Sequence, residues 1–582
     1  METNAKAYSS TWVTTPTSIY SFSRPSRELG LPFRNAVTDF DQRVIKQILI
    51  DGDEELKKCE MELNRLNAAI IGVQSRRAGI QREMESYQAL LSPVQKMPTE
   101  ILTEIFMLCA RDIENSDGMG DIMMISMVCG RWRELAFSVP ALWSHIDMSI
   151  GHSPKDDGHY HRLRRYVETF LERSRNSQLT LNLAWEAVHS FDSDMSVDEE
   201  SVASIFGALR MNSDRVRVFY FNVLAFIRYE PILRRLMTSY SSLEHLDFSF
   251  FYCGEDEELA DISFFDSATA LRSFSYRSHV GWKMKSHFPW HQLHRLVIQD
   301  AYARKLLPIL AMCNNLRHLE LSDVDDDLEE GTHSGHILLP NLQLLAVSAA
   351  DEALFSSALG HLTVPKLESF KIRGLGGRLN SEEKFWTLAS VRDLLTRSRC
   401  SITSLELHHV VLSEYDTISL FDATPELRFV KIVEAIAFDH REGRPRPLEG
   451  RRNHIVTPSF LRHLTSEFRA RTASSSFLSK LKNLTLFVHR NDLDETSLLH
   501  AIASRWSGRG QTGYTPNTTS GTYSCSEFLR SVEVRLLTFE EGSSSLGDLP
   551  MLGCFKDAGL RITLGECNCY GLLRLLGKSL LD

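Results

Sequence analysis

The feature that most constrains the fold of this chain is an apolar pattern that recurs through its C-terminal two thirds. A leucine-like residue is followed by two others, an apolar residue, one other residue and a third apolar residue. The clearest copies span Leu243–Phe248, Leu293–Ile298, Leu316–Leu321, Leu342–Val347, Leu367–Ile372, Ile402–Leu407 and Leu427–Ile432, and weaker copies begin at Val216, Leu271, Leu481 and Leu529. From 216 to 367 the starts are separated by 27, 28, 22, 23, 26 and 25 residues. This regularity predicts one stack of similar units rather than the roughly four separate domains that the length alone would suggest.

Each copy predicts a short strand of a parallel sheet, with alternate apolar side chains pointing inward. Residues 391–397 and 497–503 have the composition of return helices. The copies resemble a degenerate leucine-rich repeat array, which implies an α/β solenoid over residues 149–582. The Asn or Cys that such repeats place three residues after the third apolar position is mostly absent, since Val324, Ala350, Leu375, Val410 and Ala435 stand there. Later spacings of 35, 54 and 48 residues indicate insertions or divergent copies.

A solenoid of this kind exposes a long face that usually binds another macromolecule. The side chains expected to point outward from the strands form the candidate face, and their mixed charge identifies no class of partner. They include Glu244, His245, Arg317, His318, Glu320, Glu368, Lys371, Glu406, His408 and Lys431.

A heptad pattern precedes the repeats, within a predicted helix over residues 51–93. Apolar residues and one cysteine advance in alternating steps of three and four from Leu56 to Leu91, interrupted by Arg77, and Pro93 ends the helix. The segment is either a coiled coil that pairs two copies or recruits another helix, or an amphipathic helix folded onto its own protein. Arg77, Gly72 and Gly79 oppose a strong dimer. Residues 1–50 are predicted to be mostly a flexible tail, because the first 35 or so are rich in Ser, Thr and Pro and show no apolar period.

The segment between the heptads and the repeats predicts two or three short packed helices. A helix begins near Pro98, and its apolar residues form a wide stripe from Ile101 to Cys109. After a polar loop, apolar and small residues from Ile125 to Ala136 again fall on one helical face, which Pro140 ends. About 50 residues of this kind are marginally stable alone, so a partner or neighbouring domain is expected to support them.

The residues of this segment resemble the F-box motif. The resemblance rests on the opening Met97-Pro-Thr-Glu-Ile-Leu-Thr-Glu-Ile-Phe106, the core Val128-Cys-Gly-Arg-Trp-Arg-Glu-Leu-Ala136 and the close Pro140-Ala-Leu-Trp143. It implies a three-helix module over residues 94–148 that binds the Skp-family adaptor of SCF-type cullin-RING ubiquitin ligases. By the family pattern, adaptor contacts are assigned to Pro98, Ile101, Leu102, Ile105 and Phe106, with Val128, Trp132 and Leu142 divided between contact and module core. The alternative is that all of these side chains are ordinary core.

Charge and composition narrow the classes of partner, cellular location and activity that are expected of this chain. The net charge of −10 disfavours nucleic acid as a partner, and ten scattered cysteines favour a reducing, intracellular location, cytoplasmic or nuclear. No apolar stretch reaches the roughly 20 residues of a membrane span. No Walker A, HExxH or GxSxG pattern occurs, so we expect no intrinsic catalysis, no metal and no cofactor. A basic loop with arginines at 441, 444, 446, 451 and 452 is either a solvated insertion or a reader of phosphorylated or acidic targets.

The sequence thus predicts the substrate-recognition subunit of an SCF-type ligase. The F-box-like module would dock on the Skp-family adaptor and, through it, on a cullin, while the repeat body holds an unidentified protein target. The alternative is a protein-interaction scaffold outside a ligase that uses the repeat surface and the coiled coil.

Overall fold

The computed structural model comprises two compact units, residues 1–98 and 99–582, which we describe separately. The described residues are 39–110, 121–150, 158–186, 199–224, 240–250, 265, 267–277, 287–325, 336–349, 352–374, 388–439, 444–446, 455–465, 477–489, 493–506, 529–538, 555–556 and 560–568. The expected flexible tail therefore lies, up to residue 38, outside the described part.

The first unit consists of one long helix, α1 (Asp39–Leu91), followed by the short 3-10 helix η1 (Pro93–Lys96). Pro93 stands just beyond the helix end, as predicted, but α1 begins at Asp39 and so takes in residues that the sequence analysis assigned to the tail. The apolar heptad side chains are exposed along its whole length, from Leu56 at 64% to Leu91 at 74%. A stripe of exposed apolar side chains is therefore the main surface feature of the described part of this unit.

The second unit begins with four short helical segments: α2 (Thr99–Cys109), α3 (Asp121–Val128), α4 (Gly130–Ser138) and the 3-10 helix η3 (Pro140–Trp143). The predicted single helical face from Ile125 to Ala136 is wrong in one respect. The backbone at Cys129 is extended, with φ −158° and ψ 170°, so the chain breaks there into α3 and α4. The break changes which side chains face inward on either side of it.

A sheet of 14 parallel strands follows, in which every strand pairs with its neighbours in chain order. In that order the strands are β1 (His145–Ile150), β2 (Leu179–Glu186), β3 (Val216–Leu224), β4 (His245–Phe250), β5 (Ser273–Arg277), β6 (Arg295–Tyr302), β7 (His318–Asp325), β9 (Leu344–Ala349), β11 (Ser369–Gly374), β12 (Ser404–His408), β13 (Phe429–Val433), β16 (Asn483–His489), β17 (Ser531–Thr538) and β18 (Arg561–Asn568). Two small sheets lie outside it, the parallel pair β8 (Ile337–Leu338) and β10 (Leu362–Thr363) and the antiparallel pair β14 (Ala437–Asp439) and β15 (Arg444–Arg446).

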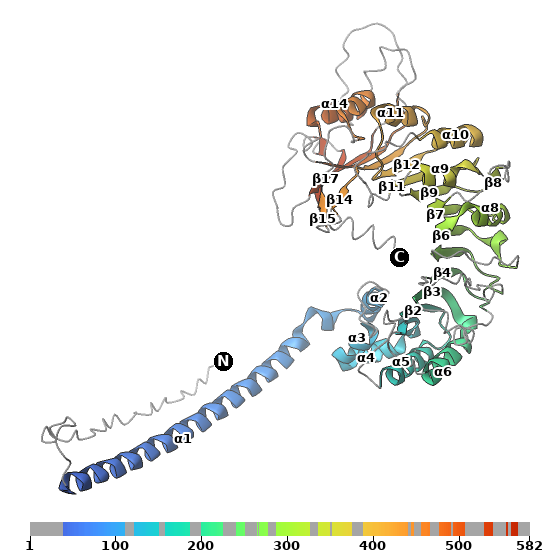
Figure 1. Ribbon diagram of the computed structural model, residues 1–582. Coiled ribbons are helices and arrows are strands. Elements are labelled where there is room, and N and C mark those ends of the chain that lie inside the picture. Colours follow the sequence, from blue (N-terminus) through green and yellow to red (C-terminus); the bar gives the residue numbers. More distant parts are fainter. Residues whose placement is uncertain are drawn as a thin grey trace, which may run out of the picture. The chain divides into compact units, whose positions relative to one another are not determined.

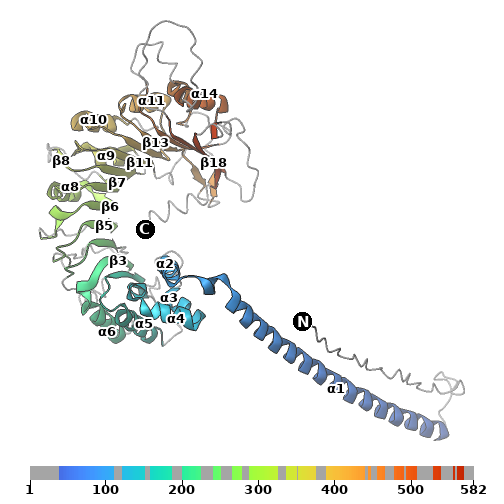
Figure 2. The ribbon, with the colours of Figure 1, turned by 180° about the vertical axis from the view of Figure 1, so that it is seen from behind.

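Helices connect many of the strands and cover one face of the sheet. They are α5 (His159–Ser174), α6 (Glu199–Arg210), α8 (Ala303–Met312), α9 (Glu352–Gly360), α10 (Ala389–Ser398), α11 (Glu414–Asp422), α12 (Pro458–Leu464) and α14 (Glu495–Arg505). Figures 1 and 2 show α8, α9, α10, α11 and α14 on the same side of the strands. In β12, Leu405 and Leu407 are buried, whereas Glu406 and His408 are half-buried on the opposite face. The predicted alternation of inward apolar and outward polar side chains is therefore confirmed. Both predicted return helices are also confirmed, as α10 and α14.

All eleven predicted copies of the repeat pattern fall on strands, and three further strands were missed. β2 alternates leucines at 179, 181 and 183 but lacks the earlier leucine that the pattern requires. β18 has Ile562 and Leu564 in register with Val532 and Val534 of β17 but has Gly559 where the first leucine should stand, and β1 follows directly on the helical region. Mixed α/β architecture with a large parallel sheet is therefore established.

A tight turn before most strands explains the first leucine of the pattern. In eight copies its backbone N–H donates to the carbonyl three residues earlier, at N···O distances of 3.1–3.4 Å. The residues that supply these carbonyls are all buried: Tyr240, Ala268, Trp290, Cys313, Leu339, Val364, Thr424 and Leu478. The repeating unit therefore has a fourth buried position, which the sequence analysis overlooked because its occupants vary from alanine to tryptophan.

Backbone hydrogen bonds maintain the stacking without the polar side-chain ladder that the sequence lacks. The residue after the first leucine donates its N–H to the equivalent carbonyl of the preceding copy. Ten such bonds are present, with N···O distances of 2.7–2.9 Å. The first joins the Glu244 N–H to the Arg217 carbonyl, and the last joins the Arg530 N–H to the Lys482 carbonyl. Val324, Val410 and Ala435 are buried apolar residues at the expected ladder position, and burial of these side chains adds packing there instead.

One buried arginine joins three segments near the C-terminal end of the sheet. Arg505 of α14 is 8% exposed, and its guanidinium donates to the carbonyls of Leu464, Phe477 and Leu478. These carbonyls belong to the end of α12 and to the turn before β16. A buried cation with this many acceptors is stabilising only while all of them remain paired.

We expect Arg505→Ala to lower the free energy of unfolding by about 2–4 kcal/mol, because three buried carbonyls lose their donor. Arg462→Ala is the matched control, since Arg462 is exposed and, among the described residues, its guanidinium bonds only to the Pro458 carbonyl of its own helix. Thermal unfolding followed by circular dichroism would measure both. Equal melting temperatures for the two variants would contradict this role of Arg505.

Candidate functional site

Helix α2 has one face buried and one face exposed. Leu102 and Phe106 are each 1% exposed and pack inward. Ile101, Ile105 and Leu108, which follow one another at intervals of four and three residues along the helix, are 51, 38 and 68% exposed. The wide apolar stripe predicted from the sequence is thus divided between a core half and an outward half.

Helix α3 repeats this arrangement. Ile122 is buried, while Met124, Met127 and Val128 are between 57 and 62% exposed and share a second outward face. We call the exposed apolar side chains of α2 and α3 together the apolar outer face; its members are Ile101, Ile105, Leu108, Met124, Met127 and Val128. Pro98, the last residue of the first unit, is also exposed. Clusters of exposed apolar side chains are typical of protein-docking surfaces.

Aromatic contacts hold the inward faces together. The Phe106 and Trp132 rings pack edge-to-face with centroids 4.9 Å apart. Trp143 is fully buried, and its indole N–H donates to the Ala136 carbonyl at 2.8 Å. The Arg173 guanidinium of α5 lies 4.3 Å from the centroid of the Trp143 ring. Trp143 thereby fixes the helical region to the first layer of the sheet, which supplies the neighbouring domain that so short a module was expected to need.

The exposure of their side chains divides the residues that the family pattern assigned to adaptor contact into two groups. Pro98, Ile101, Ile105 and Val128 are exposed, and Trp132 is half-buried. Leu102, Phe106 and Leu142 are each 1% exposed, so their side chains have no surface to offer a partner in this structure. These three side chains therefore agree with the alternative given above, that the residues of the motif are ordinary core. Leu102 differs most from expectation, because the helix turns it toward Phe106 and away from Ile101.

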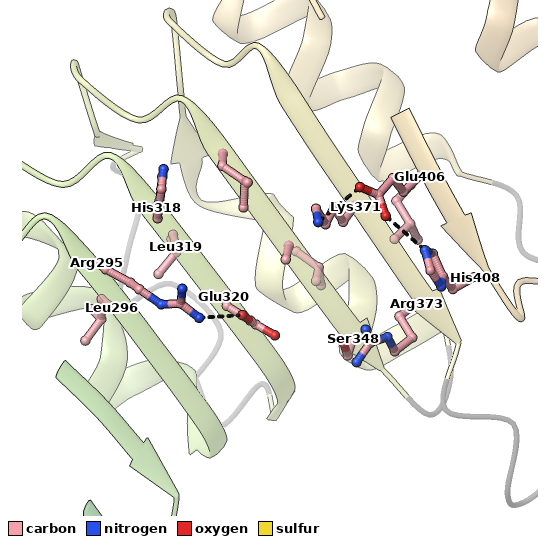
Figure 3. A pocket seen from close by; sticks show the side chains of 14 residues that line it. Arg295, Leu296, His318, Leu319, Glu320, Ser348, Lys371, Arg373, Glu406 and His408 are labelled. Atoms are coloured by element: carbon pink, nitrogen blue, oxygen red, sulfur yellow. Dashed lines mark hydrogen bonds and ion pairs between the residues drawn. The ribbon is translucent and has the colours of Figure 1, made fainter. Parts of the chain in front are cut away.

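A second candidate site is a hollow of about 250 Å³ on the face of the sheet opposite the helices. We call it the sheet hollow. Its residues come from β6, β7, β9, β11 and β12 (Figure 3), and five belong to the outward set predicted from the sequence: His318, Glu320, Lys371, Glu406 and His408.

Short side chains on the central strand create the sheet hollow. The strand register aligns Glu320 of β7 with Ala346 of β9, and Ala346 with Lys371 of β11. Ser348, two residues further along β9, lies beside Ser322 of β7. At the first of these positions β9 presents a methyl group between two long charged side chains, and at the second it presents a hydroxyl between Ser322 and Arg373. The surface is therefore lowered along β9, between walls of charged side chains on either side. Most of the charged residues beside the hollow could be predicted from the leucine pattern, but the small residues on its floor could not.

Ion pairs organise both walls. On one side, Arg295 Nη2 lies 3.7 Å from Glu320 Oε2. On the other, the Glu406 carboxylate bridges Lys371 Nζ at 3.0 Å and His408 Nε2 at 3.1 Å (Figure 3). Burial by itself would raise the pKa of Glu406, but the hydrogen bonds from His408 and Lys371 outweigh it and lower the pKa to about 2.

The histidines of the sheet hollow are neutral at physiological pH. Burial lowers the pKa of His408 despite its bond to Glu406, with Lys431 and Arg373 adding to the effect. Burial and then the nearby cations Arg295, Arg317 and Lys371 lower the pKa of His318. Neutral His408 therefore donates one N–H to Glu406, and the cationic character of the walls comes from arginine and lysine.

The described residues contain no group of three His, Cys, Asp or Glu side chains arranged to hold a metal ion. Within the same residues no helix is long and apolar enough to cross a membrane. Of the basic loop, only residues 444–446 are described, as β15; Arg441, Arg451 and Arg452 lie outside the described part.

Comparison with known families decides the nature of the helical region. Residues 94–149 match the F-box-like family. The match covers η1, α2, α3, α4 and η3 and reaches into β1, and it agrees closely with the predicted module of residues 94–148. No curated protein matches the chain. An F-box-like domain suggests a role in substrate recognition by a ubiquitin ligase, and the apolar outer face belongs to this domain.

The low pKa of Glu406 predicts a pH dependence of stability. Ionised Glu406 stabilises the folded chain above its ordinary pKa of 4.5, and this contribution is lost as the pH falls toward about 2. Glu406→Gln should therefore show a shallower loss of stability than the wild type between pH 5 and pH 3. Denaturant unfolding at several pH values would measure the slopes.

Glu368→Gln is the control, because Glu368 is exposed one strand away. It should retain the wild-type slope. A slope for Glu406→Gln equal to that of the wild type would contradict the charge arrangement given above.

Proposed function

We propose that this protein is the substrate-recognition subunit of an SCF-type cullin-RING ubiquitin ligase. Its F-box-like domain would dock on a Skp-family adaptor, and through it on a cullin. The observation that carries the proposal is the apolar outer face, which combines six exposed apolar side chains on two short helices with the F-box-like match. Burial of such side chains in an interface is a strong source of affinity.

Within this proposal, the adaptor contacts Pro98, Ile101, Ile105 and Val128, with Trp132 contributing its exposed edge. Leu102, Phe106 and Leu142 act indirectly, because they fix the helices that carry the contacts. Leu108, Met124 and Met127 are contacts that the family pattern alone did not assign.

The body that follows the F-box-like domain would hold the protein target. We propose that it is a degenerate leucine-rich repeat solenoid, a reading supported by the chain-order parallel strands, the spacing of 22 to 28 residues and the repeated turn before the strands. The target would occupy the sheet hollow, where a concave floor lies between charged walls. Catalysis in such a complex is proximity, since holding the target raises the effective concentration of its lysines near the ligase's active site.

We expect Ile101→Asp combined with Ile105→Asp to reduce adaptor binding at least a hundredfold, because two carboxylates would enter an apolar interface. Both side chains are exposed, so the variant should remain folded. Co-purification of the tagged full chain with a Skp-family adaptor and cullin would measure the effect. Leu338→Asp, at another exposed leucine of the second unit, is the matched control. Undiminished adaptor recovery with the double variant, or no adaptor recovered with the wild type, would favour the scaffold alternative.

We expect Ala346→Phe to reduce target capture while leaving adaptor binding unchanged, because a phenyl ring fills the sheet hollow without removing a charge. Thr485→Phe is the control, at the same register row on β16, well away from the hollow. Quantitative mass spectrometry of proteins that accumulate on the chain during proteasome inhibition would compare the variants. Identical sets of captured proteins for Ala346→Phe and wild type would exclude the hollow as the target site.

A further inference from the structure

The apolar stripe of α1 is an extended surface for which the F-box-like domain provides no use. Nine apolar heptad side chains between Leu56 and Leu91 are 46 to 74% exposed. The same heptad register continues backward to Leu49 and Ile45, so the stripe extends beyond the segment predicted from the sequence. A stripe of period 3.5 over this length pairs most efficiently with a second helix of the same period.

We propose that α1 pairs with α1 of a second copy of this chain as an antiparallel coiled coil. This proposal goes beyond adaptor and target binding and does not depend on either of them. It is carried by the separation of charge along the helix. Residues 51–62 contain six carboxylates and two lysines, a net charge of −4, whereas residues 63–82 contain four arginines and no acidic residue, a net charge of +4.

A parallel, in-register pair would place like charges together. In the heptad, Arg77 occupies a core position, so a parallel pair would bury Arg77 against Arg77 of the second copy. It would also oppose the two acidic segments, with Glu55 beside Glu60 of the second copy at flanking positions. An antiparallel pair instead lays each acidic segment along the basic segment of its neighbour.

One antiparallel register satisfies both the core and the charges. With Leu63 facing Leu66 of the second copy at the centre, residues 39–90 of the two helices overlap, a length of about 75 Å. The outer core layers then pair Cys59 with Ile70, Leu56 with Val73, Gly52 with Arg77, Leu49 with Ile80 and Ile45 with Met84.

In this register Arg77, which a parallel pair would bury against its own copy, becomes favourable. Gly52 has no side chain, which leaves room for the stem of Arg77 from the second copy and lets its guanidinium reach the carboxylates of Asp53 and Glu55. Arg76 faces Glu55 across the interface. Neither Arg76 nor Arg77 makes an ion pair within the described residues, whereas Arg65 is already bonded to Glu62 of its own helix. A shift by one heptad would set Glu55 against Glu83 and Cys59 against Arg77, which is less favourable.

The native thiol Cys59 makes the arrangement testable in the full chain, because it is exposed on the stripe. Ile70→Cys introduces a second thiol that faces Cys59 of the second copy in the proposed register. We expect the oxidised variant to form dimers linked between residues 59 and 70, identified by mass spectrometry of the linked peptides. The variant Ile70→Cys with Cys59→Ser should lose this link.

Two comparisons decide orientation and register. A parallel pair would link Cys59 to Cys59 in the oxidised wild type, and the shifted register would link residues 59 and 77 in an Arg77→Cys variant; either result would overturn the proposal. Sedimentation velocity of the reduced wild type should show a dimer at micromolar concentration that Leu66→Asp converts to a monomer. A wild type that remains monomeric at that concentration would also overturn it. The adaptor-binding variant Ile101→Asp with Ile105→Asp should dimerise like the wild type, so failure of one proposal is distinguishable from failure of the other.

Discussion

The structure depends above all on hydrogen bonds between the backbones of successive parallel strands. Ten bonds of nearly equal length join each copy to the one before it, always from the residue after the first leucine of the pattern. They involve main-chain atoms only, so the side chains at these positions can vary. The first residues of successive copies are 22 to 54 residues apart, so the connections between strands differ greatly in length. Because the bonds need no particular side chain, all of these strands can still join one sheet without a shared ladder of polar side chains.

The two faces of the sheet differ in burial and in the kind of side chain that they carry. The helix-side face is apolar and close to fully buried, as Leu405 and Leu407 illustrate. On the opposite face, β9 carries the small residues Ala346 and Ser348. At the other end of the same unit, Trp143 ties the F-box-like domain to α5 through Arg173. The apolar outer face and the sheet hollow therefore belong to the same compact unit.

Most strands and the first helix of the F-box-like domain could be predicted from the sequence, because side chains buried at regular intervals produce a regular apolar pattern. The strands at 245–250 and 404–408 follow directly from the leucine pattern, and the helix around Ile101 from its stripe. What could not be predicted depends on local backbone geometry or on neighbours in space. The extended backbone at Cys129 exposes Val128, and the direction of the α2 core decides that Leu102 is buried while Ile101 is not. The sheet hollow arises from residues on separate strands, which sequence spacing alone does not bring together.

We have proposed that the apolar outer face of α2 and α3 docks on a Skp-family adaptor. Hydrogen–deuterium exchange of the full chain, alone and saturated with the adaptor, tests it most directly, because exchange reports which helices become protected on binding. We expect slower exchange in α2 and α3 and unchanged exchange in the strands that form the sheet hollow. Protection confined to the sheet, or no protection anywhere at adaptor concentrations above micromolar, would contradict it.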